Sequence, residues 1–67
     1  LSAPLSVGKS VVFGDIEGQL HFLDRTNGEP LLRLPTDGSA VVRLQALPDG
    51  ALLAATRNGG LFAFRPG

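Results

Sequence analysis

The residues best suited to chemistry lie in one short stretch, GDIEGQLHFLD, which runs from Gly14 to Asp24. It contains carboxylates at Asp15, Glu17 and Asp24, together with the only histidine of the chain, His21. Carboxylates beside an imidazole can exchange protons with a substrate or supply oxygen and nitrogen ligands to a metal ion. The stretch is therefore either an active site or one unit of a repeating scaffold that has polar residues in its turns.

An internal repeat favours the scaffold. A shift of 41 residues aligns VGKSVVFGDIEGQLHFLD with PDGALLAATRNGGLFAFR and places Gly18 on Gly59. In both copies a turn, an apolar run, an x-Gly turn and a second apolar run follow in the same order. The x-Gly steps, Glu17-Gly18 and Asn58-Gly59, predict two-residue hairpin turns, because such turns need the positive φ that Gly adopts freely.

The second copy acts as a control for the polar residues. Thr56, Asn58, Phe62 and Arg65 stand where the first copy has Asp15, Glu17, His21 and Asp24. Since the repeat accepts either set, the fold requires none of these residues. We interpret the carboxylates as turn residues, because short polar side chains favour turns by forming hydrogen bonds with the local backbone.

The other candidates have weaker contexts. His21 lies between Leu20 and Phe22, so it faces the opposite side of its strand, and no Ser or Asp stands at a recognisable motif spacing to be its partner. Glycines 14, 18 and 28 do not form a phosphate loop, because no helix follows them. The serines Ser2, Ser6, Ser10 and Ser39 lack a nucleophile elbow and are interpreted as turn and strand-edge residues. The sequence thus predicts no catalytic, cofactor-binding or metal residue.

Three arginines have one functional interpretation. Arg33, Arg43 and Arg57 could project from the surface and pair with acidic residues of a protein partner, since Arg is enriched at interfaces. The alternative is that they are solvated surface residues.

The elements that must position these residues are short strands. Nine glycines and five prolines separate apolar runs rather than forming one linker, and no run has helical spacing with caps. We expect strands near residues 2–7, 10–16, 19–25, 30–35, 42–47, 51–57 and 60–65. Runs of consecutive apolar residues, such as Val11, Val12 and Phe13, indicate strands covered on both faces.

A repeat near 40 residues with about four strands is typical of a β-propeller blade. The fold class predicted is all-β, with antiparallel four-stranded blades and about one and three-quarter blades in this chain. We expect residues 1–37 to form one blade and residues 38–67 to form an incomplete final blade within the same propeller domain. The strand from Leu61 to Phe64 would be an open edge, so the chain is expected to self-associate or to pair with another chain.

Composition excludes several functional classes. The chain has 67 residues, no cysteine and six basic residues that balance six acidic ones. Disulfides and thiolate metal sites are excluded, and the dispersed basic residues argue against nucleic acid. No apolar run approaches membrane-spanning length and no signal layout is present, while a start at Leu1 indicates a processed product or a piece of a longer protein.

The sequence resembles a known family. The run APLSVGKSVVFGDIEGQLHFLDRTNGEPLLRL and the later LPDGALLAATRNGGLFAFRP are similar to the C-terminal end of the BamB family of outer-membrane protein assembly factors, lipoproteins with a PQQ-like β-propeller. Gly14-Asp15, Gly18 and Leu20-His21-Phe22 look like the GD-x-x-G-x-LH-aromatic segment of that family. The turn from Asp24 to Gly28 and the terminal NGGLFAFRP are also similar, so the resemblance covers essentially the whole chain.

The resemblance implies a non-enzymatic scaffold without cofactors. Members of this family lie in the periplasm, are tethered to the outer membrane through a lipidated N-terminal Cys, and bind the POTRA domains of BamA. This chain has no such Cys, so no lipid anchor is carried over, and no partner-binding residue is transferred.

Two alternatives remain. A PQQ-dependent dehydrogenase propeller, which binds the quinone with Ca²⁺, would also use a D-x-x-x-G turn, matched here by Asp24 and Gly28. Leu32 occupies the position of the docking Trp, and the chain has neither Trp nor Cys, which disfavours this class. An interaction propeller of the WD or kelch type lacks its Trp-Asp or Gly-His pair.

Overall fold

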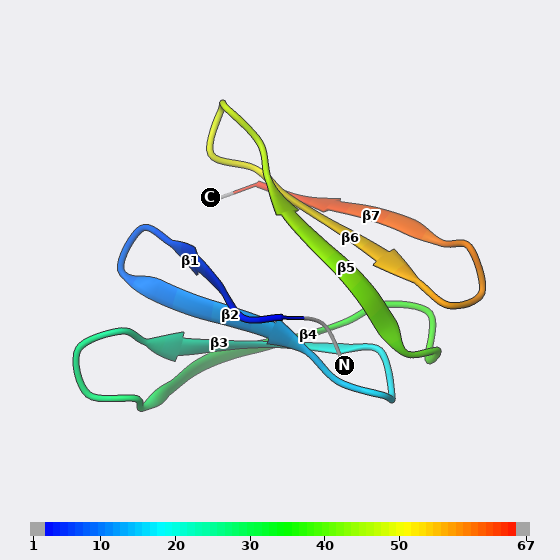
Figure 1. Ribbon diagram of the computed structural model, residues 1–67. Coiled ribbons are helices and arrows are strands. Elements are labelled where there is room, and N and C mark those ends of the chain that lie inside the picture. The colour runs from blue at the N-terminus through cyan, green and yellow to red at the C-terminus, as the bar shows by residue number, and fades with distance from the viewer. Residues whose placement is uncertain (1–2, 66–67) are drawn as a thin grey trace.

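The computed structural model describes residues 3–65, which form strands joined by turns and contain no helix. Figure 1 shows these strands in two groups along the chain. Their bounds are β1 Leu5–Val7, β2 Ser10–Gly14, β3 Gln19–Asp24, β4 Pro30–Pro35, β5 Val41–Ala46, β6 Leu52–Thr56 and β7 Leu61–Phe64. The predicted all-β class is confirmed. Ser2 and the predicted start of the first strand lie outside the described residues.

The strands form two antiparallel sheets in simple up-and-down order. One sheet has the order β1-β2-β3-β4 and the other β5-β6-β7, as expected for partial propeller blades. Each observed strand lies close to its predicted range, because a glycine-marked turn separates each strand from the next. Among the described residues, no helix could span a membrane.

The repeat also holds in the strand pairing. In the first sheet Val12 pairs with Phe22 and Gly14 with Leu20. Moved along the chain by the same 41 residues, these become the pairs that β6 and β7 make, Leu53 with Ala63 and Ala55 with Leu61. The two hairpins are therefore equivalent in register as well as in sequence pattern.

The prediction of two-residue hairpin turns is wrong. Four residues separate β2 from β3, and within them Gly18 N donates to Asp15 O at 3.3 Å while Asp15 N donates to Gln19 O at 3.0 Å. Only Gly18 has positive φ, at 82°, whereas the two-residue turn would also need it at Glu17. The loop is a tight turn followed by a left-handed glycine, and β6 and β7 are joined in the same way through Gly59.

Gly18 is also required by space. A Cβ at this position would lie 2.7 Å from Ser39 O and 2.8 Å from Thr36 Oγ1. Both atoms belong to the segment that connects β4 to β5, and Thr36 binds Gly18 O through its backbone N at 3.0 Å and its hydroxyl at 2.7 Å. The β2–β3 turn and the connection between the sheets are thus held together at one glycine.

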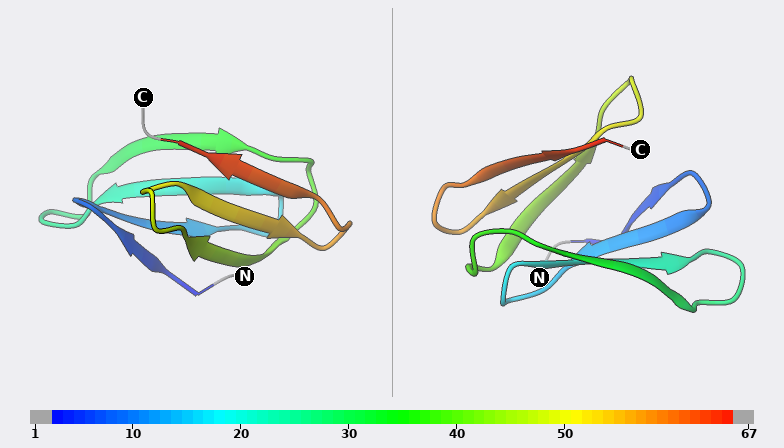
Figure 2. Two further views of the ribbon diagram at one scale, coloured as in Figure 1. Left: turned by 90° about the horizontal axis from the view of Figure 1, so that it is seen from above. Right: turned by 180° about the vertical axis from the view of Figure 1, so that it is seen from behind.

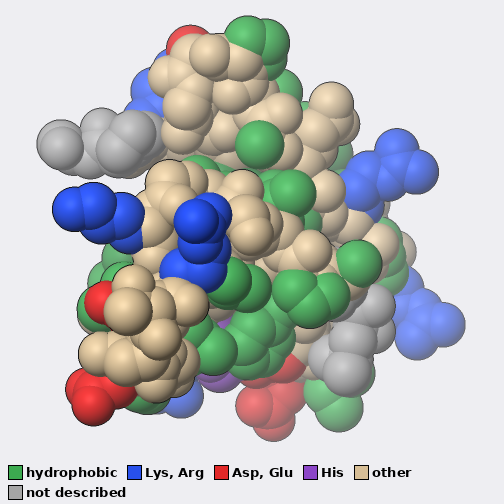
Figure 3. All heavy atoms as spheres, turned by 60° about the vertical axis from the view of Figure 1, so that its left-hand side comes forward, with side chains coloured by type: hydrophobic (Ala, Val, Ile, Leu, Met, Phe, Trp, Pro, Cys, Tyr) green, Lys and Arg blue, Asp and Glu red, His purple; other side chains and the backbone are tan. Residues whose placement is uncertain are grey.

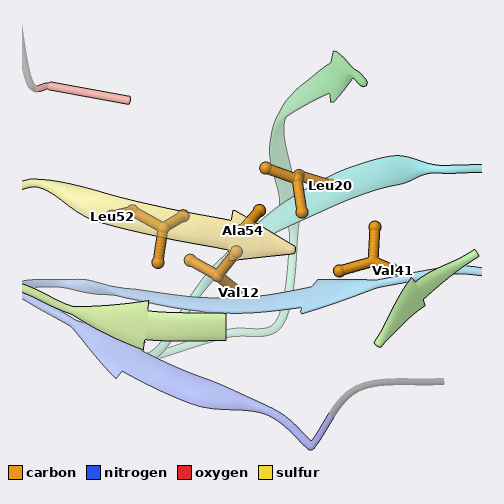
Figure 4. Packing of buried hydrophobic residues seen from close by; sticks show 5 residues of the cluster. All are labelled: Val12, Leu20, Val41, Leu52 and Ala54. Atoms are coloured by element: carbon orange, nitrogen blue, oxygen red, sulfur yellow. The ribbon is translucent and has the colours of Figure 1, made fainter. Parts of the chain in front are cut away.

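The two sheets pack face to face as two layers, which Figure 2 shows from above and from behind. They approach where β5 lies against β1 and β2. Figure 4 shows Val12 pointing toward Leu52 and Ala54 of β6, with Leu20 and Val41 beside them. These five side chains are at most 3% exposed and form the core, around which partly buried residues such as Phe22 and Phe62 pack.

Candidate functional site

The polar stretch that suggested chemistry folds into the β2–β3 hairpin. Asp15 follows the last residue of β2, Glu17 lies exposed in the turn, His21 is in the middle of β3, and Asp24 is its last residue. The hairpin brings two of these side chains, Asp15 and His21, into contact, while Glu17 stays in the turn and Asp24 ends β3.

Asp15 and His21 form a hydrogen-bonded pair. His21 Nε2 lies 2.7 Å from Asp15 Oδ2, and the two side chains are 26% and 24% exposed. The imidazole hydrogen bond, opposed by burial and helped by backbone hydrogen bonds, holds the pKa of Asp15 below its ordinary value. An ionised carboxylate only accepts hydrogen bonds, so Nε2 carries the hydrogen and donates.

The same carboxylate closes the turn. Asp15 Oδ1 accepts hydrogen bonds from the backbone N–H groups of Glu17 and Gln19, each at 2.9 Å. One side chain therefore joins the turn to the strand residue that faces it. Motif spacing does not reveal this partner of His21. The signal in the sequence is the predicted hairpin, which brings residue 21 back beside residue 15.

Phe13 and Arg33 complete a row across the first sheet. Each pairs directly with His21, Phe13 from β2 and Arg33 from β4, so the three side chains share one face. The rings of Phe13 and His21 stack with centroids 4.8 Å apart and an interplanar angle of 9°. His21 faces away from the buried Leu20, as predicted.

In the second hairpin, Thr56 stands at the position of Asp15 and likewise binds the backbone of its own turn. Thr56 Oγ1 accepts from Gly60 N at 3.0 Å, as Asp15 accepts from Gln19 N, and donates to Asp37 Oδ2 at 2.8 Å. The repeat thus accepts Thr in place of Asp15, as predicted, but both copies keep a side-chain oxygen that accepts a hydrogen bond at this position.

The remaining polar candidates have structural contacts or lie on the surface. Asp24 Oδ1 accepts from Thr26 N at 2.7 Å, and Ser39 donates from its N and its hydroxyl to Asp37. Arg33, Arg43 and Arg57 are exposed. Figure 3 shows basic side chains scattered over one face rather than gathered in a patch.

The donor groups do not converge on a metal position. Among residues 3–65, no group of three His, Cys, Asp or Glu side chains is placed to hold an ion. Asp15 accepts hydrogen bonds from the backbone of its own turn and from His21. Leu32, which occupies the Trp position of a quinone-binding repeat, is 52% exposed on the edge strand β4. The polar side chains therefore close a hairpin within a sheet scaffold.

Comparison with known proteins agrees with this scaffold. No family model matches the chain. It is 39% identical over 66 residues to the outer membrane protein assembly factor BamB of Burkholderia pseudomallei, covering 98% of this chain and 17% of that protein. The corresponding protein of Bordetella pertussis is 40% identical over 65 residues, covering 97% and 17%. The chain is BamB-like over almost its whole length.

A third relative gives the same result. The BamB protein of Vibrio cholerae is 42% identical over 60 residues, which is 88% of this chain and 15% of that protein. The chain thus spans about one sixth of the length of the BamB proteins that it matches. The resemblance found from the Gly14 to Phe22 segment is confirmed.

Proposed function

We propose that the chain is part of a BamB-type scaffold that assists the assembly and insertion of outer-membrane proteins at the periplasmic face of the bacterial outer membrane, without catalysis. The observation that carries this proposal is the identity of about two residues in five over almost the whole chain to proteins named as outer membrane protein assembly factors. The scaffold geometry supports it, because the polar residues of the hairpin serve their own turn.

The proposed partner is the POTRA region of a BamA-like protein. The exposed arginines support a protein partner, since Arg33, Arg43 and Arg57 present unburied guanidinium groups on both sheets and on the β6–β7 turn. No individual residue is assigned to the contact. Division of the chain into one blade, residues 1–37, and an incomplete blade, residues 38–67, is part of the same proposal and is supported by the two separate sheets.

A binding measurement tests the partner. Immobilised POTRA region of a BamA protein should bind the chain saturably in biolayer interferometry, and the signal should weaken as salt rises if arginine pairs contribute. The triple variant Arg33→Gln, Arg43→Gln, Arg57→Gln is the matched probe, because all three side chains are exposed and their loss should leave the circular dichroism spectrum unchanged. Absence of saturable binding by the folded wild-type chain would contradict the proposed partner.

Self-association is the second part of the proposal. β7 is an edge strand with no proline or charge among its four residues, whereas the edge strand β4 begins and ends with proline and contains Arg33. Prolines and charges discourage strand addition, so β7 is the less protected edge. Pairing of this edge with another chain, or association of two copies, would cover it.

A further inference from the structure

Several turns of the chain contain an asparagine or aspartate directly before a glycine. These steps are Asn27-Gly28, Asp37-Gly38, Asp49-Gly50 and Asn58-Gly59. At such a step the backbone nitrogen of the glycine can attack the side-chain carbonyl carbon of the preceding residue and close a succinimide ring. Glycine favours this attack, because it has no side chain to hinder the approach. Which step reacts therefore depends on the contacts that hold each side chain in its turn.

Three of these side chains are held by the residue that follows the glycine. Oδ1 accepts a hydrogen bond at 3.0 Å from the N–H of Glu29 in the first turn, of Ser39 in the second and of Ala51 in the third. This is the local bond that Asn and Asp commonly form in turns. It restrains rotation of the side chain, which must bring its carbonyl carbon onto the glycine nitrogen before a ring can close.

The side chain of Asn58, in the turn that joins β6 to β7, lacks this bond (Figure 1). The corresponding donor is Gly60 N, which donates to Thr56 Oγ1 at 3.0 Å instead. Thr56 is 4% exposed and its hydroxyl donates to Asp37 Oδ2 at 2.8 Å, so the competing acceptor is fixed in place. Among residues 3–65, no group forms a hydrogen bond with the exposed side chain of Asn58.

The two aspartate steps are slowed for a second reason. Hydrogen bonds from Ser39 hold the pKa of Asp37 below its ordinary value, and the hydrogen bond from Arg65 does the same for the pKa of Asp49. Both side chains are therefore ionised at neutral pH. An ionised carboxylate resists attack by a nitrogen nucleophile, because it would have to expel an oxide, whereas an amide expels ammonia. The two asparagines are the steps that remain.

Of these two, Asn27 is restrained at both reacting groups. Its Oδ1 is held by the backbone, and the nitrogen that would attack, Gly28 N, donates to Asp24 O at 2.7 Å. In the β6–β7 turn the attacking nitrogen, Gly59 N, donates to Thr56 O at 3.0 Å. A backbone bond must therefore open in either turn, as exposed turns do locally. The β6–β7 turn then needs no side-chain bond to break as well.

We propose that Asn58 is a site of spontaneous deamidation, with water as the co-reactant, and that it reacts before Asn27. Gly59 N loses its proton to solvent base and forms a bond to Cγ of Asn58. The Cγ–Nδ2 bond breaks, and ammonia leaves after taking a proton from water. Water then opens the succinimide at one of its two carbonyl carbons, which yields aspartate or isoaspartate. This modification does not depend on the role in outer-membrane assembly.

The reaction changes both the charge and the backbone of the β6–β7 turn. The chain has six acidic and six basic residues, so one new carboxylate makes its formal net charge negative. Asn58 N donates to Ser39 Oγ at 3.3 Å, and that hydroxyl donates to Asp37 Oδ1, so the new charge arises close to an existing carboxylate. In the isoaspartate form Cβ enters the main chain and lengthens the turn. The product thus alters the contact between this turn and the segment that connects the two sheets.

Peptide mapping of the folded chain during incubation in mildly alkaline buffer tests the site. Trypsin cuts after arginine, so the two asparagines fall in separate peptides, residues 26–33 and 58–67. Isoaspartate at position 58 hinders the cut after Arg57, so the uncut peptide 44–67 is counted with the second. Mass spectrometry should show conversion of amide to acid at least about three times faster at Asn58, because a side-chain bond must first open only at Asn27.

Two matched variants and a denatured sample complete the test. Glutamine keeps the amide but closes a ring much more slowly, so Asn58→Gln should suppress the early acidic form in isoelectric focusing, and Asn27→Gln should leave it unchanged. In concentrated urea the two peptides of the wild-type chain should convert at similar rates, since neither turn is then held. Equal rates in the folded chain, faster conversion at Asn27, or an early acidic form that survives Asn58→Gln would overturn the proposal. A preference for Asn58 that persisted undiminished in urea would do so too, because the folded turns would then not cause it.

Discussion

At Asp15 one carboxylate makes three hydrogen bonds, two to backbone N–H groups of its own turn and one to His21. Each bond contributes about 0.5–1.5 kcal/mol net, and bonds to an ionised group lie at the upper end or above. At the same position in the repeat, Thr56 accepts one backbone N–H. The carboxylate of the first hairpin therefore accepts more hydrogen bonds from its own hairpin than the hydroxyl of the second.

The variant Asp15→Ala should lower the free energy of unfolding by about 2 kcal/mol, because three donors lose their acceptor at a half-buried site. Urea denaturation at neutral pH, followed by circular dichroism, measures this loss. Asp24→Ala is the control, since Asp24 accepts a backbone N–H from Thr26 in an exposed turn, and it should cost less.

The same pair predicts an acid dependence. The pKa of Asp15 is lowered in the folded chain, mainly by the hydrogen bond from His21. Its carboxylate therefore stabilises the fold fully at any pH above the pKa that Asp15 has in the unfolded chain. That contribution is lost as the pH falls through the lower, folded pKa. The difference in the free energy of unfolding between wild type and Asp15→Ala should therefore shrink as the pH is lowered. A difference that stayed constant until acid unfolds the chain would contradict the stabilising role of the Asp15 carboxylate.

At the scale of the elements, the two sheets approach each other closely at Gly14. A Cβ built there would lie 2.3 Å from Cβ of Val41, which is far inside contact distance. The equivalent residue, Ala55, lies on the outer face of the second sheet, where a methyl group meets no such neighbour. Glycine at position 14 thus reflects packing between sheets rather than backbone conformation.

The variant Gly14→Ala is accordingly expected to destabilise the chain by about 1–3 kcal/mol, the usual cost of overpacking a core. The added methyl must push Val41, which is fully buried, and with it β5. Thermal unfolding by circular dichroism measures the change. Ser6→Ala on the exposed side of β1 is the control and should change stability little; an unchanged melt for Gly14→Ala would show that the sheets are not packed this closely.

The elements themselves were largely predictable and their contacts were not. Strand ends followed from glycines that end each run, and the offset between Gly18 and Gly59 gave the equivalent hairpins. The turn type was misassigned, because an x-Gly step also fits a longer loop in which Gly alone has positive φ. The bond from His21 to Asp15 depends on that loop geometry, which a motif spacing does not encode.

At the scale of the whole molecule, the facing sides of the two sheets enclose a small apolar core. Among residues 3–65, six apolar residues are buried, namely the five of the core cluster and Ala51 beside them in sequence. A chain of this size buries about 60% of the surface of its unfolded state, which leaves little margin of stability. Any ligand or partner that binds the folded form should therefore raise the unfolding temperature measurably, which makes thermal unfolding a sensitive test of competing functions.

A dehydrogenase-type site should produce such a rise with pyrroloquinoline quinone and Ca²⁺, whereas a scaffold should not respond. Ca²⁺ takes about 6–8 oxygen ligands, and residues 3–65 bring no three acidic or histidine side chains together. We expect the circular dichroism melt to stay unchanged when both are added, singly or together. Circular dichroism is the suitable probe because the chain contains neither Trp nor Tyr. A saturable rise that required both ligands would favour the dehydrogenase class, and a rise with Ca²⁺ alone would indicate a cation site outside the geometry described.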